Sequence, residues 1–153
     1  MEATLQDRDR LIVSKIGRTF SRLTGKDYAP ERYDIVIFNH NDEFGGEVSE
    51  KQLIKRVIGL PGDRVVVNDG AVTVYNTENP DGIPVDQAGP QKDSVDTATP
   101  GNTEETVKPG EVYAMGDNRD NSLDSRSFGA IREADIVGKL VLRIYPFDKS
   151  QKY

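Results

Sequence analysis

The chain has 153 residues, of which 20 are Lys or Arg, 26 are Asp or Glu and one is His, and it contains no cysteine. This length predicts a single domain. A formal net charge of −6 without a basic stripe argues against a nucleic-acid partner. The lack of cysteine excludes disulfides, thiolate metal sites and a cysteine nucleophile. No run of eighteen apolar residues is present, so no segment is expected to span a bilayer.

Apolar residues recur mainly with a period of two, which predicts an all-β fold. Asn68-Asp69-Gly70 tolerates the positive φ of a tight turn and predicts a hairpin. The only helical pattern is about one turn over Arg132–Ile136. The expected strands are Leu11–Val13, Ile35–Phe38, Leu53–Ile58, Arg64–Val67, Ala71–Tyr75, Val112–Met115 and Gly138–Tyr145.

Two segments differ from the strand pattern of the rest of the chain. Residues 76–110 hold five of the eight prolines, seven acids and two lysines, with few large apolar residues. They cannot bury a core of their own, so we expect a hairpin base followed by a mobile acidic excursion. Gly17–Glu31 is interpreted as a surface loop. A membrane-contacting surface is the less favoured alternative, because the apolar content there is small.

The window Gly116–Arg126, G-D-N-R-D-N-S-L-D-S-R, is the most unusual part of the chain. It holds three carboxylates, two guanidiniums, two hydroxyls and two side-chain amides, with one apolar side chain. A solvated charged turn is the ordinary interpretation of such a window. The interleaved charges and the apolar residues on both sides favour a loop that is fixed against a core, where each charge needs a partner.

Lys55 lies in a second unusual segment, an apolar run that ends at the turn Pro61-Gly62-Asp63. In a strand, Lys55, Val57 and Gly59 share one face. A lysine on an edge strand protects against aggregation. A buried lysine has a lowered pKa and becomes a potential base. The segment by itself leaves both interpretations open.

Other catalytic chemistries have weaker support. A Ser–His–Asp arrangement would depend on His40, which we expect in a polar loop over His40–Gly46. Asp117, Asp120 and Asp124 suggest calcium, but the glycine and the final glutamate of a calcium loop are misplaced. We therefore expect no metal and no cofactor. Serine–lysine chemistry remains.

Two motifs together resemble the conserved boxes of bacterial type I signal peptidases. They are K-R-V-I-G-L-P-G-D at Lys55–Asp63 and G-D-N-R-D-N-S-x-D-S-R-x-x-G at Gly116–Gly129. Tyr33–Phe38 is similar to the G-D-I-V-V-F strand of that family, and Met1–Lys15 is similar to the stretch that follows its nucleophile. The resemblance implies irregular, mostly antiparallel sheets and a partly open barrel. It also implies a catalytic β core from residues 1–75 and 110–153, with an inserted lobe at 76–109.

The resemblance also implies roles for individual residues. Lys55 would act as general base towards a serine, with a pKa depressed by about 3 units so that it works near neutrality. Ser122 would hydrogen-bond the Lys55 amine, and an Asp124–Arg126 ion pair would hold the Ser122 loop. The residues expected to support this loop are Arg56, Asp117, Asn118, Arg119, Asp124, Ser125 and Arg126.

The chain departs from the family pattern at its start. In the family the nucleophilic serine stands immediately before the methionine that matches Met1, and Ala3 replaces a proline. We therefore expect no peptidase activity from the chain as given. The alternatives are a nucleophile-free homologue that binds peptides as an assembly factor or chaperone, and a self-cleaving repressor protease. The last is disfavoured because the chain has no DNA-binding segment.

The resemblance further implies the partners and the location. Substrates would be signal peptides of exported preproteins, cut after a small residue with a second small residue two positions before it. An extended peptide presents alternate side chains to one wall, so paired shallow pockets explain that selectivity. An N-terminal anchor would hold the domain at the bacterial cytoplasmic membrane, on the extracytoplasmic side.

Overall fold

The computed structural model describes residues 10–14, 29–44, 47–90, 95, 98–145 and 151–152. Most of the family-like stretch Met1–Lys15 and most of the expected loop Gly17–Glu31 lie outside these residues. Among the described residues, no helix is long and apolar enough to cross a membrane.

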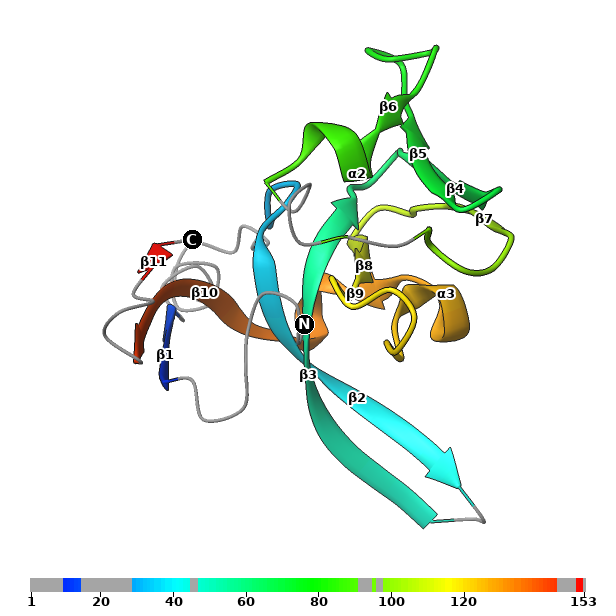
Figure 1. The fold of residues 1–153 in the computed structure, drawn as a ribbon. Helices are drawn as coiled ribbons and strands as arrows, with labels where there is room; N and C mark the ends of the chain where they lie inside the picture. Colours follow the sequence, from blue (N-terminus) through cyan, green and yellow to red (C-terminus); the bar gives the residue numbers. More distant parts are fainter. Residues whose placement is uncertain are drawn as a thin grey trace.

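The first sheet is antiparallel and carries the lysine strand near its centre (Figure 1). Its strand order is β1-β10-β2-β3-β8-β9, and β11 pairs with β10. The hairpin formed by β2 and β3 extends beyond the rest of the molecule as a two-stranded ribbon. The strands are β1 (Arg10–Ser14), β2 (Ile35–Phe44), β3 (Glu47–Gly59), β8 (Glu111–Met115), β9 (Ile131–Arg132), β10 (Ile136–Tyr145) and β11 (Gln151–Lys152).

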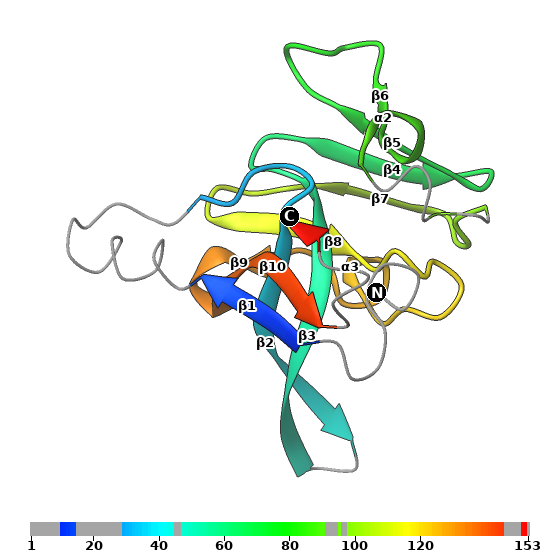
Figure 2. The same cartoon turned by 60° about the vertical axis from the view of Figure 1, so that its left-hand side comes forward.

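The second sheet has four strands in the order β6-β5-β4-β7, and it lies above the first sheet in Figure 2. Asp69 and Gly70 both have positive φ in the turn between β4 and β5, so the expected hairpin is confirmed. The strands are β4 (Arg64–Asn68), β5 (Ala71–Tyr75), β6 (Ile83–Pro84) and β7 (Thr103–Thr106). The helical elements are α2 (Val85–Ala88), α3 (Ser125–Phe128) and the 3-10 turn η1 (Glu133–Asp135).

The predicted fold class is confirmed, since all seven expected strands are present and η1 is the expected helical turn. The polar loop expected over His40–Gly46 is wrong: β2 continues to Phe44 and His40 pairs with Lys51. The end of this hairpin extends into solvent, so both of its faces can be polar. Its sequence therefore lacks the alternation of apolar and polar residues that would predict a strand.

The expectation of a hairpin base followed by a mobile acidic excursion over residues 76–110 needs correction, because the excursion itself carries regular structure. The segment contains β6, α2 and β7. Val85 and Val107 are fully buried and fix these short elements to the core. β4 and β5 share a sheet with β6 and β7, so pairing crosses the expected boundary at 75/76. The division into a catalytic core and an inserted lobe stays a prediction.

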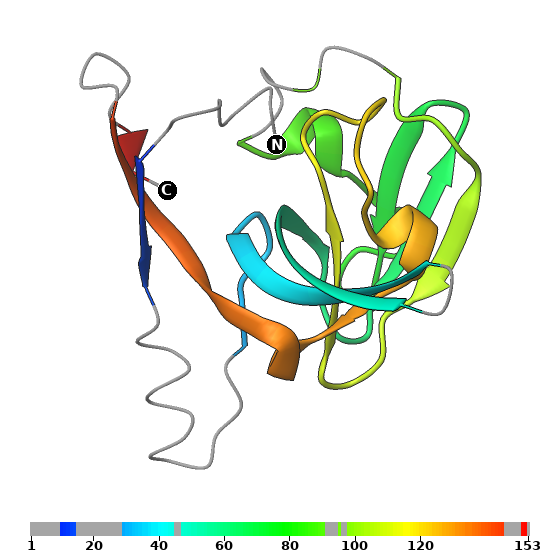
Figure 3. The same ribbon diagram turned by 90° about the horizontal axis from the view of Figure 1, so that it is seen from below.

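Two apolar clusters form the core, one on each side of β3 and β8. Val57 and Ala114 belong to one cluster, whereas Ile58 and Met115 belong to the other. Because successive side chains of a strand point to opposite faces, both strands are covered on both faces. Figure 3 shows β3 and β8 between the β1–β10 pair and the second sheet. This central position takes residues 55–59 of β3 out of water.

Gly59 ends β3 where the two sheets meet, at a register shift in the β3–β8 pairing. A Cβ atom added to Gly59 would lie 2.6 Å from Val65 Cγ2 and 3.1 Å from Tyr113 Cβ. Both neighbours are buried, so they have little room to move. The close approach of the two sheets therefore depends on a residue without a side chain.

We expect Gly59→Ala to destabilise the protein by about 1–3 kcal/mol, the usual cost of overpacking a dense core. Thermal or urea unfolding measures it. Glu50→Ala, at an exposed position of the same strand, is the matched control and should leave stability nearly unchanged. Equal stability of Gly59→Ala and the parent would contradict the close-approach argument.

Candidate active site

Lys55 and Ser122 meet in a part-buried contact, although 67 positions separate them in the chain. Lys55 is 8% exposed, and its Nζ donates to Ser122 Oγ at 3.0 Å. β3 pairs with β2 on one side and β8 on the other, so Lys55 does not lie on an edge strand and the aggregation-guard interpretation is wrong. Burial lowers the pKa of Lys55, Arg126 acts in the same direction, and Asp124 and Asp117 oppose it.

Gly116 is the first residue of the polar loop Gly116–Arg126, and it makes room for the contact between Lys55 and Ser122. A Cβ atom at Gly116 would overlap the Ser122 side chain and would lie 3.5 Å from Lys55 Nζ. The Gly116 amide donates to Asp124 Oδ2 at 3.0 Å. Glycine is therefore required here by the close approach of the serine and lysine side chains.

Asp124 is the fully buried centre of the loop, and its carboxylate has partners on all sides. It is the N-cap of α3, accepting from the Arg126 amide at 3.2 Å. The Arg126 guanidinium donates to both Asp124 oxygens at 2.9 Å. Burial by itself raises the pKa of Asp124, but hydrogen bonds from Arg126, Gly116 and Ser122 hold it below its usual range. The expected Asp124–Arg126 ion pair is present and almost completely buried.

The hydrogen bond from Ser122 to Asp124 also sets the direction of the contact with the lysine. A serine hydroxyl has one proton, and here the Asp124 carboxylate accepts it. The Ser122 oxygen is therefore the acceptor of a Lys55 N–H. In the neutral amine, the nitrogen lone pair is then left for another partner. This geometry suits a lysine that accepts a proton.

Arg56 follows Lys55 on β3 and fixes the strand to the start of the polar loop. Its guanidinium donates to Asp117 Oδ1 at 2.9 Å and Oδ2 at 2.7 Å, and both side chains are buried. Arg56 Nη1 also donates to the Tyr33 carbonyl at 3.0 Å. Tyr33 has a φ of 73°, which is unusual for a bulky residue and matches the glycine of the similar family strand.

The remaining predicted residues form the frame of the loop. Asn118 Oδ1 accepts from the Asn121 amide at 3.3 Å, which closes a turn. Ser125 Oγ accepts from the Ala114 amide at 3.0 Å, which holds α3 against β8. The Arg119 guanidinium contacts Asp86 and Thr99. Sequence reasoning missed Asp86 and Thr99, because they lie in the acidic segment and no local pattern links them to a motif 20 or 33 positions away.

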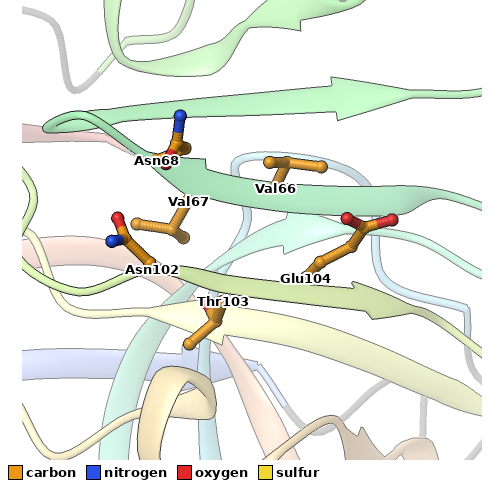
Figure 4. Close-up of a pocket in the computed structure, with 6 residues that line it drawn as sticks. All are labelled: Val66, Val67, Asn68, Asn102, Thr103 and Glu104. Atoms are coloured by element: carbon orange, nitrogen blue, oxygen red, sulfur yellow. The ribbon is translucent and has the colours of Figure 1, made fainter.

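The structure supports no other centre among the described residues. No cluster of His, Asp and Glu there could hold a metal ion. The His40 ring stacks on Phe128 with centroids 4.3 Å apart. A pocket of about 370 Å³ lies between β4 and β7 (Figure 4) and is lined by none of the predicted site residues. Its lining residues are Val66, Val67, Asn68, Asn102, Thr103 and Glu104.

Comparison with known proteins gives the family of the chain. The family model described as signal peptidase, peptidase S26 matches residues 1–145. Probable signal peptidase I-2 from Synechocystis sp. is 36% identical over 150 residues, which are 95% of this chain and 59% of that protein. Signal peptidase IB from Staphylococcus aureus is 32% identical over 162 residues, covering 97% of this chain and 75% of that protein.

A solved structure shows the same architecture. The crystal structure of a signal peptidase I from Enterococcus faecalis aligns with a TM-score of 0.52 and 27% identity, over 73% of this chain and 97% of that one. These matches place the chain among the S26 peptidases. Within them, it belongs to the bacterial type I signal peptidase family.

Ser122→Ala and Asp124→Ala should differ in their effect on stability. Ser122→Ala removes the hydroxyl between Lys55 and Asp124, and we expect little change in melting temperature. Asp124→Ala leaves a buried guanidinium without its carboxylate, which costs about 3–5 kcal/mol. Thermal melts of both variants test this ordering. If Ser122→Ala unfolds the protein while Asp124→Ala has the melting temperature of the parent, then the structural role assigned to Asp124 and the non-structural role assigned to Ser122 are wrong.

Lys55→Met should stabilise the protein at neutral pH, by an amount that shrinks as the pH rises. The folded pKa of Lys55 lies below its ordinary value of 10.5. Between these two pKa values the unfolded chain binds the extra proton, so the parent gains stability with rising pH and the methionine variant lacks this gain. Urea unfolding of both proteins from neutral pH to above 10.5 measures the difference. Lys108→Met, at an exposed position, is the control. A difference that stays constant through this range would contradict a lowered Lys55 pKa.

Proposed function

We propose that this chain is the catalytic domain of a signal peptidase I, a serine endopeptidase with serine–lysine chemistry. The contact of the buried Lys55 Nζ with Ser122 Oγ at 3.0 Å is the observation that carries the proposal. The nucleophile would be a serine immediately before Met1, at the position that the family motif gives it.

Lys55 would act as general base and then as general acid. The neutral amine takes the proton of the serine hydroxyl as the serine oxygen attacks the scissile carbonyl. The resulting ammonium gives that proton to the leaving amine when the peptide bond breaks. Lys55 then activates the water that hydrolyses the acyl ester. Because burial lowers the pKa of Lys55, the neutral amine is available at a lower pH than in an exposed lysine.

Ser122 and the charged residues would work through position. Ser122 accepts from the amine and donates to Asp124, so it orients the lysine lone pair. Arg126 and Arg56 hold the loop through Asp124 and Asp117. These groups need not touch the substrate. Their contribution is to keep the lysine dry and fixed in direction.

The substrates would be signal peptides of exported preproteins, cut at small-x-small sites. The names of the relatives from Synechocystis sp. and S. aureus support this substrate class. The chain spans 59% of the length of the Synechocystis protein. We infer that the remaining part of such a protein supplies the membrane anchor, with this domain on the extracytoplasmic side of the bacterial membrane.

A nucleophile-free role as a peptide-binding assembly factor is less well supported. Such a factor needs no activated amine. Burying a lysine in a dry site costs stability, because desolvation disfavours its charged form. The burial of Lys55 against Ser122 therefore favours the peptidase.

The proposal is tested by placing Ser or Ala before Met1 and assaying cleavage of an Ala-x-Ala peptide. We expect turnover only from the serine-bearing chain, with a pH profile that rises through the Lys55 pKa, below 10.5. Lys55→Met should abolish the activity because methionine cannot accept a proton, whereas Lys108→Met should retain it. Substantial activity of Lys55→Met would show that another group is the base. Lys55-dependent cleavage by the chain as given would show that the nucleophile lies within it.

A further inference from the structure

The acidic segment 76–109 contacts the polar loop mainly through the buried Arg119, and Arg126 Nη1 adds a bond to the Pro100 carbonyl at 3.2 Å. Arg119 is 2% exposed, and its guanidinium donates to Asp86 Oδ2 at 2.8 Å and Asp86 Oδ1 at 2.5 Å. Arg119 Nη1 also donates to Thr99 Oγ1 at 2.6 Å. Asp86 lies on α2 and Thr99 lies just before β7, and Figure 3 shows α2 beside the polar loop.

The other edge of the same guanidinium holds the backbone next to the catalytic pair. Arg119 Nε donates to the Gly116 carbonyl at 3.1 Å. Gly116 is the residue whose missing side chain leaves room for Ser122 and Lys55. The Arg119 carbonyl in turn accepts from Arg126 Nη2 at 2.8 Å. Arg119 thus connects the acidic segment to both ends of the loop that carries Ser122.

The Asp86 end of this connection is anchored in the second sheet. Val85, the preceding residue, is fully buried in the core cluster that includes β4 and β5. The Thr99 amide donates to the Gly70 carbonyl in the β4–β5 turn at 2.8 Å. A buried guanidinium is stable only with a matched carboxylate, so the place of Arg119 depends on that of Asp86.

We propose that Asp86 is a positioning residue for the Lys55–Ser122 pair. Its carboxylate fixes Arg119, Arg119 fixes the Gly116 backbone, and Gly116 sets how closely Ser122 approaches the lysine amine. The use of the Lys55–Ser122 pair in catalysis rests on the proposed function, whereas the contacts from Asp86 through Arg119 to Gly116 rest on the geometry alone. The acidic segment is then part of the active-site scaffold, through residues that lie outside both family motifs.

The first test measures the Lys55 pKa by NMR titration of the chain as given, labelled with ¹³C-lysine. We expect Asp86→Asn to raise this pKa towards 10.5, because a loosened loop lets water reach the amine. Removing a nearby negative charge has the opposite effect on a lysine, so a rise reports position rather than lost charge. Asp86→Glu should restore part of the parent value. Glu104→Gln, which breaks an exposed pair with Arg64 in the same segment, should change nothing.

Thr99→Val provides a milder variant, because it keeps the Asp86–Arg119 ion pair and removes a hydroxyl partner. It should also raise the Lys55 pKa, by a smaller amount than Asp86→Asn does. If Asp86→Asn does not fold, the result for Thr99→Val tests the positioning role. In the serine-bearing chain, Asp86→Asn should lower kcat by about 10- to 100-fold with KM nearly unchanged, as expected for misplacement of a catalytic group.

The outcomes separate this proposal from the proposed function. An unchanged Lys55 pKa in every variant that folds, with lower melting temperatures only, would overturn the positioning role. A lowered pKa would report lost charge and would likewise overturn it. A raised pKa together with an inactive serine-bearing parent would support the positioning role and refute the peptidase. A raised pKa with a selective loss of kcat supports both.

Discussion

Keeping the Lys55 amine out of water is the constraint on which the rest of the structure depends. A lysine serves as a base near neutral pH only when its ammonium form is disfavoured, and burial does this most directly. For this proposed base, the C-terminal half of β3 meets the need, because it lies between β2 and β8 and its two faces contact the two core clusters. The fold therefore buries the amine within its sheet, and this burial lowers its pKa.

The site is held by matched buried charges. Three arginines that lie within or beside the site each face one carboxylate, in the pairs Arg56–Asp117, Arg119–Asp86 and Arg126–Asp124. Buried ion pairs add little net stability, but each is costly to break from one side. Such pairs therefore suit a loop whose geometry matters more than its free energy. Ser122 belongs to the loop that these ion pairs hold, so its side chain has few conformations available.

The second sheet and the acidic segment also help to hold the site. Asp63 ends the lysine motif and accepts from the Arg32 guanidinium and the Asn76 side chain, so the turn after β3 is fixed from two sides. Gly59 lets the second sheet approach β8 closely. Asp86 and Thr99 then extend from that sheet to Arg119. The second sheet and the acidic segment, which follow the lysine motif in the chain, thus contact the loop Gly116–Arg126 that carries Ser122.

The sequence by itself determined the all-β class, the seven main strands and the two motifs that carry Lys55 and Ser122, because strand alternation and the dense polar pattern are local properties of the chain. Whether Lys55 lay at an edge or in the interior was left open, since burial depends on which strands become neighbours. The same limit applied to His40, whose strand continues as a polar ribbon, and to Asp86, whose partner is 33 positions away. Only the tertiary structure decided these points, because pairing across long sequence separations follows from how the sheets pack and from where each buried charge finds its counter-charge.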